Sequence, residues 1–145
     1  MGVELGAVDE SIRAVDPQKW SCKREMDILV VDDSRIMRMI LQRAIRQAGY
    51  RGLEVEEAEN AREAMEKLRA GTPRLILSDW NMPEMSGLDF LKQIRASENT
   101  VPFGFVTSEA SVEMRTLALS SGAAFMLSKP FTPDDIRDAI APILD

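Results

Sequence analysis

Several short apolar runs of this chain end in polar side chains that could take part in chemistry. These polar residues are Asp32 with Asp33, Asp79, Thr107 and Lys129. The stretch from Asp79 to Gly87 is the most informative, because a carboxylate follows an apolar run there and Pro83 then turns the chain. An aspartate at the C-terminal tip of a strand lies at the sheet edge where ligands bind in open α/β folds.

The three carboxylates predict a site for a hard divalent cation. If Asp32, Asp33 and Asp79 lie close together they repel one another, and a cation relieves that repulsion. Mg²⁺ prefers oxygen ligands and usually takes few protein carboxylates. The chain has no histidine and a single cysteine, so a zinc site built from those ligands is excluded. We therefore expect Mg²⁺, or Mn²⁺, at these aspartates.

The two remaining residues suit phosphoryl transfer. Lys129 supplies a positive charge and Thr107 a hydroxyl, and both could hold the oxygens of a transferring phosphoryl group. A carboxylate such as Asp79 can be the nucleophile. Each residue also has an ordinary interpretation, because adjacent acids often cap a helix and the other two could belong to a loop and a strand end. Their joint occurrence at four strand ends favours the chemical interpretation.

These side chains meet only if strands and helices alternate in the right order. Strands are expected at 27–31, 53–58, 75–79, 102–107 and 124–128, and helices at 34–48, 61–69, 88–96, 112–120 and 133–144. This (βα)₅ pattern predicts a doubly wound α/β fold, a parallel five-stranded sheet with helices on both faces. Right-handed crossovers would place all strand C-termini on one edge, where the polar residues converge.

The first expected helix carries an apolar stripe typical of a helix that packs one side against a core. The stripe falls at spacings of three and four and consists of Ile36, Met37, Ile40, Ala44 and Ala48. Gly49 stands where a helix commonly ends.

Composition and charge exclude several classes of function. A chain of 145 residues with 45% hydrophobic and 29% charged residues is typical of one globular domain. The net charge of −6 argues against nucleic-acid binding. No apolar run approaches the ~20 residues of a membrane helix, and no signal peptide is evident. The single Cys22 fits a reducing compartment, so we expect a cytoplasmic protein.

Residues 1–26 stand apart from the alternating pattern of 27–145. Four apolar residues there fall at helical spacings, namely Leu5, Val8, Ile12 and Val15. Pro17 would end such a helix. Two interpretations are equally open: a frayed tail, or a short helix docked on the body with Trp20 as an anchor.

Five motifs along residues 27–145 resemble a known family. They are Val31-Asp32-Asp33-Ser34, Asp79-Trp80-Asn81-Met82-Pro83, Gly87, Val106-Thr107-Ser108-Glu109 and Lys129-Pro130-Phe131. They resemble the receiver domain of bacterial two-component response regulators, in particular the single-domain chemotaxis regulators called CheY-like. The resemblance implies the flavodoxin-like strand order 2-1-3-4-5. It also implies a Lys-Pro bond that is commonly cis in the family.

The resemblance implies how the acidic residues act. Asp79 would accept a phosphoryl group from the phosphohistidine of a sensor kinase. Asp33, Asp79 and the backbone carbonyl of Asn81 would bind Mg²⁺ directly, and Asp32 would act through a water.

It further implies roles for the residues around the acceptor. Lys129 and Thr107 would hold phosphoryl oxygens, and Thr107 would shift towards the phosphate on activation. Asn81 and Glu109 would influence how fast the phosphoryl group hydrolyses. Three residues before the lysine the family usually has an aromatic residue that rotates inward, but this chain has Met126. Phe125 cannot replace it, because adjacent residues of a strand face opposite sides.

The function that follows is a stand-alone phosphorylation switch, with no output module expected after Asp145. Phosphorylation would change the face formed by 112–120, 124–128 and 133–144 and so control the binding of a target protein, in chemotaxis-type signalling, without nucleic acid or membrane. One alternative is a Mg²⁺-dependent phosphatase working through an aspartyl-phosphate, which usually needs an Asp-x-Asp pair and a cap domain. Others are a phosphorelay shuttle and a flavodoxin-type binding module, whose anionic cofactor Asp32 and Asp33 would repel.

Overall fold

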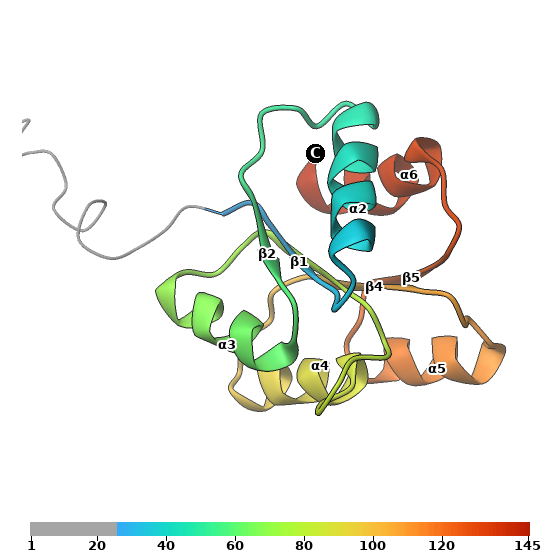
Figure 1. Cartoon of the computed structure of the whole chain (residues 1–145). Helices are drawn as coiled ribbons and strands as arrows, with labels where there is room; N and C mark the ends of the chain where they lie inside the picture. Colours follow the sequence, from blue (N-terminus) through green and yellow to red (C-terminus); the bar gives the residue numbers. More distant parts are fainter. Residues whose placement is uncertain (1–25) are drawn as a thin grey trace, which may run out of the picture.

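The computed structural model describes residues 26–145, in which five strands and five helices alternate (Figure 1). The strands are β1 (Ile28–Val31), β2 (Val55–Ala58), β3 (Leu75–Ser78), β4 (Phe103–Thr107) and β5 (Phe125–Ser128). The helices are α2 (Arg35–Gln47), α3 (Ala61–Ala70), α4 (Gly87–Ala96), α5 (Val112–Ser120) and α6 (Pro133–Leu144). Every strand and helix expected from the sequence is present, with ends that differ by up to two residues.

The strands form one parallel sheet in the order β2-β1-β3-β4-β5. This confirms the doubly wound fold and the 2-1-3-4-5 order. β1, β3 and β4 are buried along their whole length, as continuous apolar runs predict for the inner strands of a parallel sheet. Because all strands point the same way, their C-terminal ends lie along a single edge.

Helices cover both faces of the sheet (Figure 1). α2 and α6 pack on one face, where β1 contributes Ile28 and Val30 to the core. α3, α4 and α5 lie on the other face, where β1 contributes Leu29 and Val31. The alternation of side chains along β1 thus divides the core into two layers.

Each helix begins at a polar cap whose side chain accepts a backbone N–H from three residues further along. The caps are Ser34, Asn60, Ser86, Ser111 and Thr132. Such caps satisfy one of the backbone donors that a helix start leaves free. They set the points at which the chain leaves the functional edge of the sheet and turns into α2, α4 and α5.

The buried side of α2 differs from the stripe expected from the sequence. Leu41, Ala44 and Ile45 are buried, whereas Ile36 is 70% exposed and Ile40 is 46% exposed. Leu41 and Ile45 are each one position after residues of the expected stripe, which corresponds to about 100° around a helix. α2 carries more apolar residues than one core face accepts, and the surplus faces outward.

The interpretations that concerned residues 1–25, including the helical spacing of Leu5 to Val15 and the anchor role of Trp20, lie outside the described residues. Within residues 26–145, no helix has both the length and the apolar character needed to cross a lipid bilayer.

Candidate functional site

The fold brings the chemically capable residues to the C-terminal edge of the sheet. Asp32 follows β1 and Asp79 follows β3, which are neighbours in the sheet, and the N–H of Asp79 donates to the carbonyl of Val31 at 2.9 Å. Thr107 ends β4, and Lys129 follows its neighbour β5. The backbone N–H of Lys129 donates to the carbonyl of Thr107 at 2.8 Å. Residues separated by almost a hundred positions therefore meet at one place.

Three carboxylates gather at this edge, as the sequence predicted. One oxygen of each of Asp32, Asp33 and Asp79 lies within 4.8 Å of the others. Asp32 is buried, Asp79 is half-buried and Asp33 is exposed, so the group opens to solvent on one side. An all-oxygen donor set with access to water fits a hydrated hard cation such as Mg²⁺. No other group of this kind occurs in residues 26–145.

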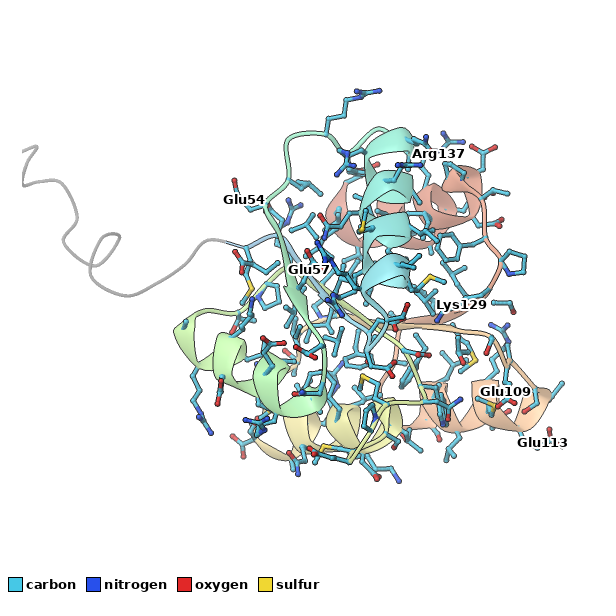
Figure 2. All side chains as sticks on the ribbon, in the orientation of Figure 1. Glu54, Glu57, Glu109, Glu113, Lys129 and Arg137 are labelled. Carbon is cyan, nitrogen blue, oxygen red and sulfur yellow. The ribbon has the colours of Figure 1, made fainter. Side chains whose placement is uncertain are left out.

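Lys129 reaches into the carboxylate group from β5, and Figure 2 shows it near the start of α2. Its Nζ lies 3.2 Å from Oδ2 of Asp32 and 3.7 Å from Oδ2 of Asp79. The Lys129–Pro130 peptide bond that follows is cis, as the resemblance implied. The cation of the lysine therefore partly balances the two more buried carboxylates.

The surroundings of Asp79 disfavour the charged form of its carboxyl group. Burial raises the pKa of its carboxyl, and the charge of Asp32 raises that pKa further. The positive charge of Lys129 and the backbone N–H groups of Trp80 and Asn81 act in the opposite direction, and the net pKa is raised. The N–H of Trp80 donates to Oδ1 at 2.7 Å, which leaves Oδ2 on the side of the lysine. A half-buried carboxylate with one oxygen facing a lysine can act as a nucleophile.

The rim around Asp79 is formed by residues from two loops. Thr107 is fully buried, and its Oγ1 accepts the backbone N–H of Glu109 at 3.3 Å. Glu109 and Asn81 are both exposed, each two residues beyond a strand-end residue of the site. Figure 2 places Glu109 just before α5. The threonine hydroxyl is thus tied to the loop that leads into α5.

Sequence reasoning missed two backbone supports of Asp32. The N–H of Ser34 donates to Oδ1 at 2.9 Å, and Arg38 Nη1 donates to the Asp32 carbonyl at 2.6 Å. Arg38 is fixed in turn by Glu57 of β2, whose Oε1 lies 2.7 Å from its Nε. Ser34 had a signal in its motif, but nothing in the pattern indicated that Arg38 and Glu57 would be neighbours.

Gly87 also supports the site. Its N–H donates to the carbonyl of Trp80 at 2.7 Å, and a Cβ at this position would collide with the backbone carbonyl oxygen of Asp79. Only a residue without a side chain lets α4 start so close to the backbone of Asp79. The sequence marked Gly87 as the end of the stretch that begins at Asp79 but did not show which atom it approaches.

Met126 and Phe125 lie on opposite faces of β5, as alternation along a strand predicts. Met126 is buried in the layer that contains Phe105, whereas Phe125 packs against the layer under α2 and α6. The ring of Phe125 covers Gly104 of β4, where any side chain would collide with it. Phe125 is therefore not available on the Met126 side.

Comparisons with known proteins agree with this geometry. The family described as the response regulator receiver domain matches residues 28–141. The chemotaxis protein CheY1 of Helicobacter pylori is 38% identical over 122 residues, which cover 82% of this chain and 97% of that protein. The chemotaxis protein CheY-3 of Vibrio cholerae is 34% identical, over 84% and 94% of the two chains. A solved structure of the chemotaxis response regulator CheY4 of Vibrio cholerae superposes with a TM-score of 0.72 at 33% identity, covering 83% of this chain and all of that one.

Proposed function

The chain belongs to the response regulator receiver family, and we propose that it is a switch controlled by phosphorylation of Asp79. Proteins of this family signal through phosphorylation and are not enzymes that turn over a separate substrate. The observation that carries the assignment is the position of Asp79, whose free Oδ2 faces Lys129 within a group of three carboxylates. Asp32 is buried and both of its oxygens are engaged, Oδ1 by the N–H of Ser34 and Oδ2 by Lys129. Asp33 is exposed and has no such partner among the described hydrogen bonds.

The chemistry is a transfer of a phosphoryl group from a phosphohistidine of a sensor kinase. Oδ2 of Asp79 forms the new O–P bond, and the P–N bond to the histidine breaks with its electron pair on the imidazole nitrogen. Lys129 holds an oxygen of the arriving phosphoryl group, and the Thr107 hydroxyl holds another. The N–H of Trp80 fixes Oδ1, so the acceptor carboxylate keeps its orientation during the transfer.

The acidic group is suited to hold Mg²⁺ during this transfer. Asp33, Asp79 and the backbone carbonyl of Asn81 would be direct ligands. Asp32 would act through a water, which agrees with its oxygens being engaged by Ser34 N–H and Lys129. Bound Mg²⁺ would offset the negative charge that the phosphoryl oxygens bring to the site.

The signal would leave through the face formed by α5, β5 and α6. Thr107 would connect a phosphorylated Asp79 to the loop before α5, because its hydroxyl accepts the N–H of Glu109, and the register pairs it with Ser128 of β5. A downstream target protein would bind this face, and hydrolysis of the aspartyl-phosphate, influenced by Asn81 and Glu109, would end the signal. The names of the relatives favour chemotaxis-type signalling. A location in the cytoplasm is favoured by the single Cys22, which fits a reducing compartment.

The test is phosphorylation of the full chain by acetyl phosphate with Mg²⁺. Intact mass should show one added phosphoryl group that is lost in acid, and Asp79→Asn should abolish the addition. Asp138→Asn is the matched control, because Asp138 is exposed and is in no described ion pair or hydrogen bond. Full labelling of Asp79→Asn would assign the acceptor to another residue.

A further inference from the structure

The outward side of α2 is an apolar surface without a described partner. Ile36 is 70% exposed and Met39 is 55% exposed, and with Ile40 they line a shallow groove of about 370 Å³. Three adjacent exposed aliphatic side chains on one helix are unusual for a surface that stays in water. Among residues 26–145, nothing covers them.

This apolar surface is framed by positive charge. α2 contains four arginines and no acid, namely Arg35, Arg38, Arg43 and Arg46. Arg43 and Arg46 line the groove, are exposed and take part in no described hydrogen bond or ion pair. The groove's single acid, Glu57, is held by Arg38 at 2.7 Å. A helix with an apolar side and acidic flanks would complement this face.

The N-terminal segment of the same chain has that character. Residues 1–16 carry four acids and one base, and their apolar residues recur at spacings of three and four. On a helix with 3.6 residues per turn, Glu4, Asp9 and Asp16 flank that apolar stripe. The other exposed apolar helix, α5, carries both Glu113 and Arg115 and offers no such match in charge.

The chain that links residues 1–16 to the described domain is long enough for this segment to reach α2. Residue 27 donates its N–H to the carbonyl of Glu54 just before β2, so the described chain begins at the sheet end where α2 also finishes. Nine residues, 17–25, link the segment to that point and can span about 30 Å. Thirteen helical residues are about 20 Å long, the length of α2 itself. The segment can therefore lie along α2 without displacing any strand.

We propose that residues 1–16 form an amphipathic helix that docks on the outward face of α2, over Ile36, Met39 and Ile40. α2 begins directly after the Asp32-Asp33 pair, so the docked segment covers the surface next to the acceptor site. The docking does not rest on the proposed function.

The experiment is paramagnetic relaxation in the full chain without any phosphodonor. A nitroxide is attached at Ala14→Cys in a Cys22→Ser background, since Ala14 lies opposite the apolar stripe on a helix. The amide signals of α2 should be broadened, and those of α5 on the far face should not. Met39→Ser and Arg43→Glu should each return the α2 signals to the level of the reduced label. Lys92→Glu, an exposed base on α4, is the matched control and should leave the broadening intact.

Three outcomes would overturn the proposal. One is broadening that is absent from α2 or centred on α3 and α4. Another is broadening that survives both α2 variants. The third is broadening in a mixture of labelled unenriched chains and unlabelled ¹⁵N chains, which would assign the groove to a second copy. Because phosphorylation plays no part, a negative result here leaves the role of Asp79 unaffected.

Discussion

For the proposed transfer, the carboxyl group of Asp79 must be held in a fixed position, which burial favours, and it must also be ionised in order to react. Burial and the neighbouring Asp32 raise its pKa, and Lys129 with two backbone N–H groups lowers it. The charged carboxylate is thus less favourable in the folded protein than in the unfolded chain. A bound cation would relieve this unfavourable charge, and transfer of a phosphoryl group would change the charge at the same carboxylate.

Replacing Asp79 by asparagine should stabilise the metal-free protein at neutral pH. A carboxyl whose folded pKa is raised favours folding fully only below its unfolded pKa, and that advantage is lost as pH rises through the folded pKa. We expect a gain on the order of 1 kcal/mol at pH 7, about 2–6 °C in Tm. In urea unfolding with a chelator, the gain should shrink towards pH 4, whereas Asp138→Asn should show no such trend. A gain that does not depend on pH would refute the electrostatic cause.

Mg²⁺ should quench the emission of Trp80, which follows Asp79 directly and packs against Phe105 with ring centroids 4.8 Å apart. The titration belongs in a Trp20→Phe background, so that a single tryptophan reports. Asp33→Ala removes an exposed carboxylate of the group without disturbing the core, and should abolish the saturable response. An unchanged titration would place the cation elsewhere.

At the scale of single residues, the sequence could predict which side chains meet at the sheet edge but not how they are supported. Asp32, Asp79 and Lys129 stand at strand ends, and the parallel topology alone brings strand ends together. The support from Arg38 requires α2 and β2 to pack at one particular distance. No local pattern encodes that distance.

Among the elements, the loop from β3 to α4 shows how closely the scaffold fits the site. α4 begins at Gly87, which has no room for a Cβ beside the carbonyl of Asp79. The proposed phosphoryl acceptor Asp79 and the first residue of α4 are therefore in direct backbone contact.

Gly87→Ala should destabilise the protein by roughly 1–3 kcal/mol, the usual effect of overpacking against atoms that cannot move aside. Because the strain falls on the acceptor loop, phosphorylation by acetyl phosphate should also slow. Gly52→Ala is the matched control, since a Cβ there has no atom within 4 Å. Equal stability and equal rates in the two variants would mean that α4 adjusts without affecting Asp79.

The elements themselves could be predicted well wherever a local signal marks them. Asn60 caps the start of α3, Gly71 stands at its end, and Pro133 starts α6, and these residue types are common at helix ends. β2 begins only at Val55, since an edge strand with polar residues lacks a clear apolar start. The orientation of α2 could not be predicted either, because Ile36 and Leu41 are equally apolar and only packing against β1 and α6 chooses between them.

At the scale of the whole molecule, the sheet connects the acceptor edge to the surface expected to bind partners. Thr107 and Ser128 are paired in register, and Met126 lies two residues before Ser128 on β5. Met126 is buried, and its carbonyl accepts Arg115 Nη1 of α5 at 3.0 Å. A change at Thr107 can thus reach α5 and β5 through two adjacent strands.

Met126→Tyr should enlarge the response of the α5–β5–α6 face to phosphorylation. A methionine is flexible and repacks without a defined change of rotamer, whereas an aromatic ring is rigid and takes few discrete positions. Converting a mostly inactive population into a mostly active one takes roughly 5.5 kcal/mol of differential stabilisation. A side chain without two distinct positions transmits a smaller share of that free energy to the α5–β5–α6 face.

The measurement is amide hydrogen exchange with and without acetyl phosphate and Mg²⁺, and the exchange should change more in Met126→Tyr than in the parent. Leu127→Tyr adds the same ring to the opposite face of β5 and should behave like the parent. If the parent and Met126→Tyr, both stably folded, respond equally, then Met126 already transmits the signal in full.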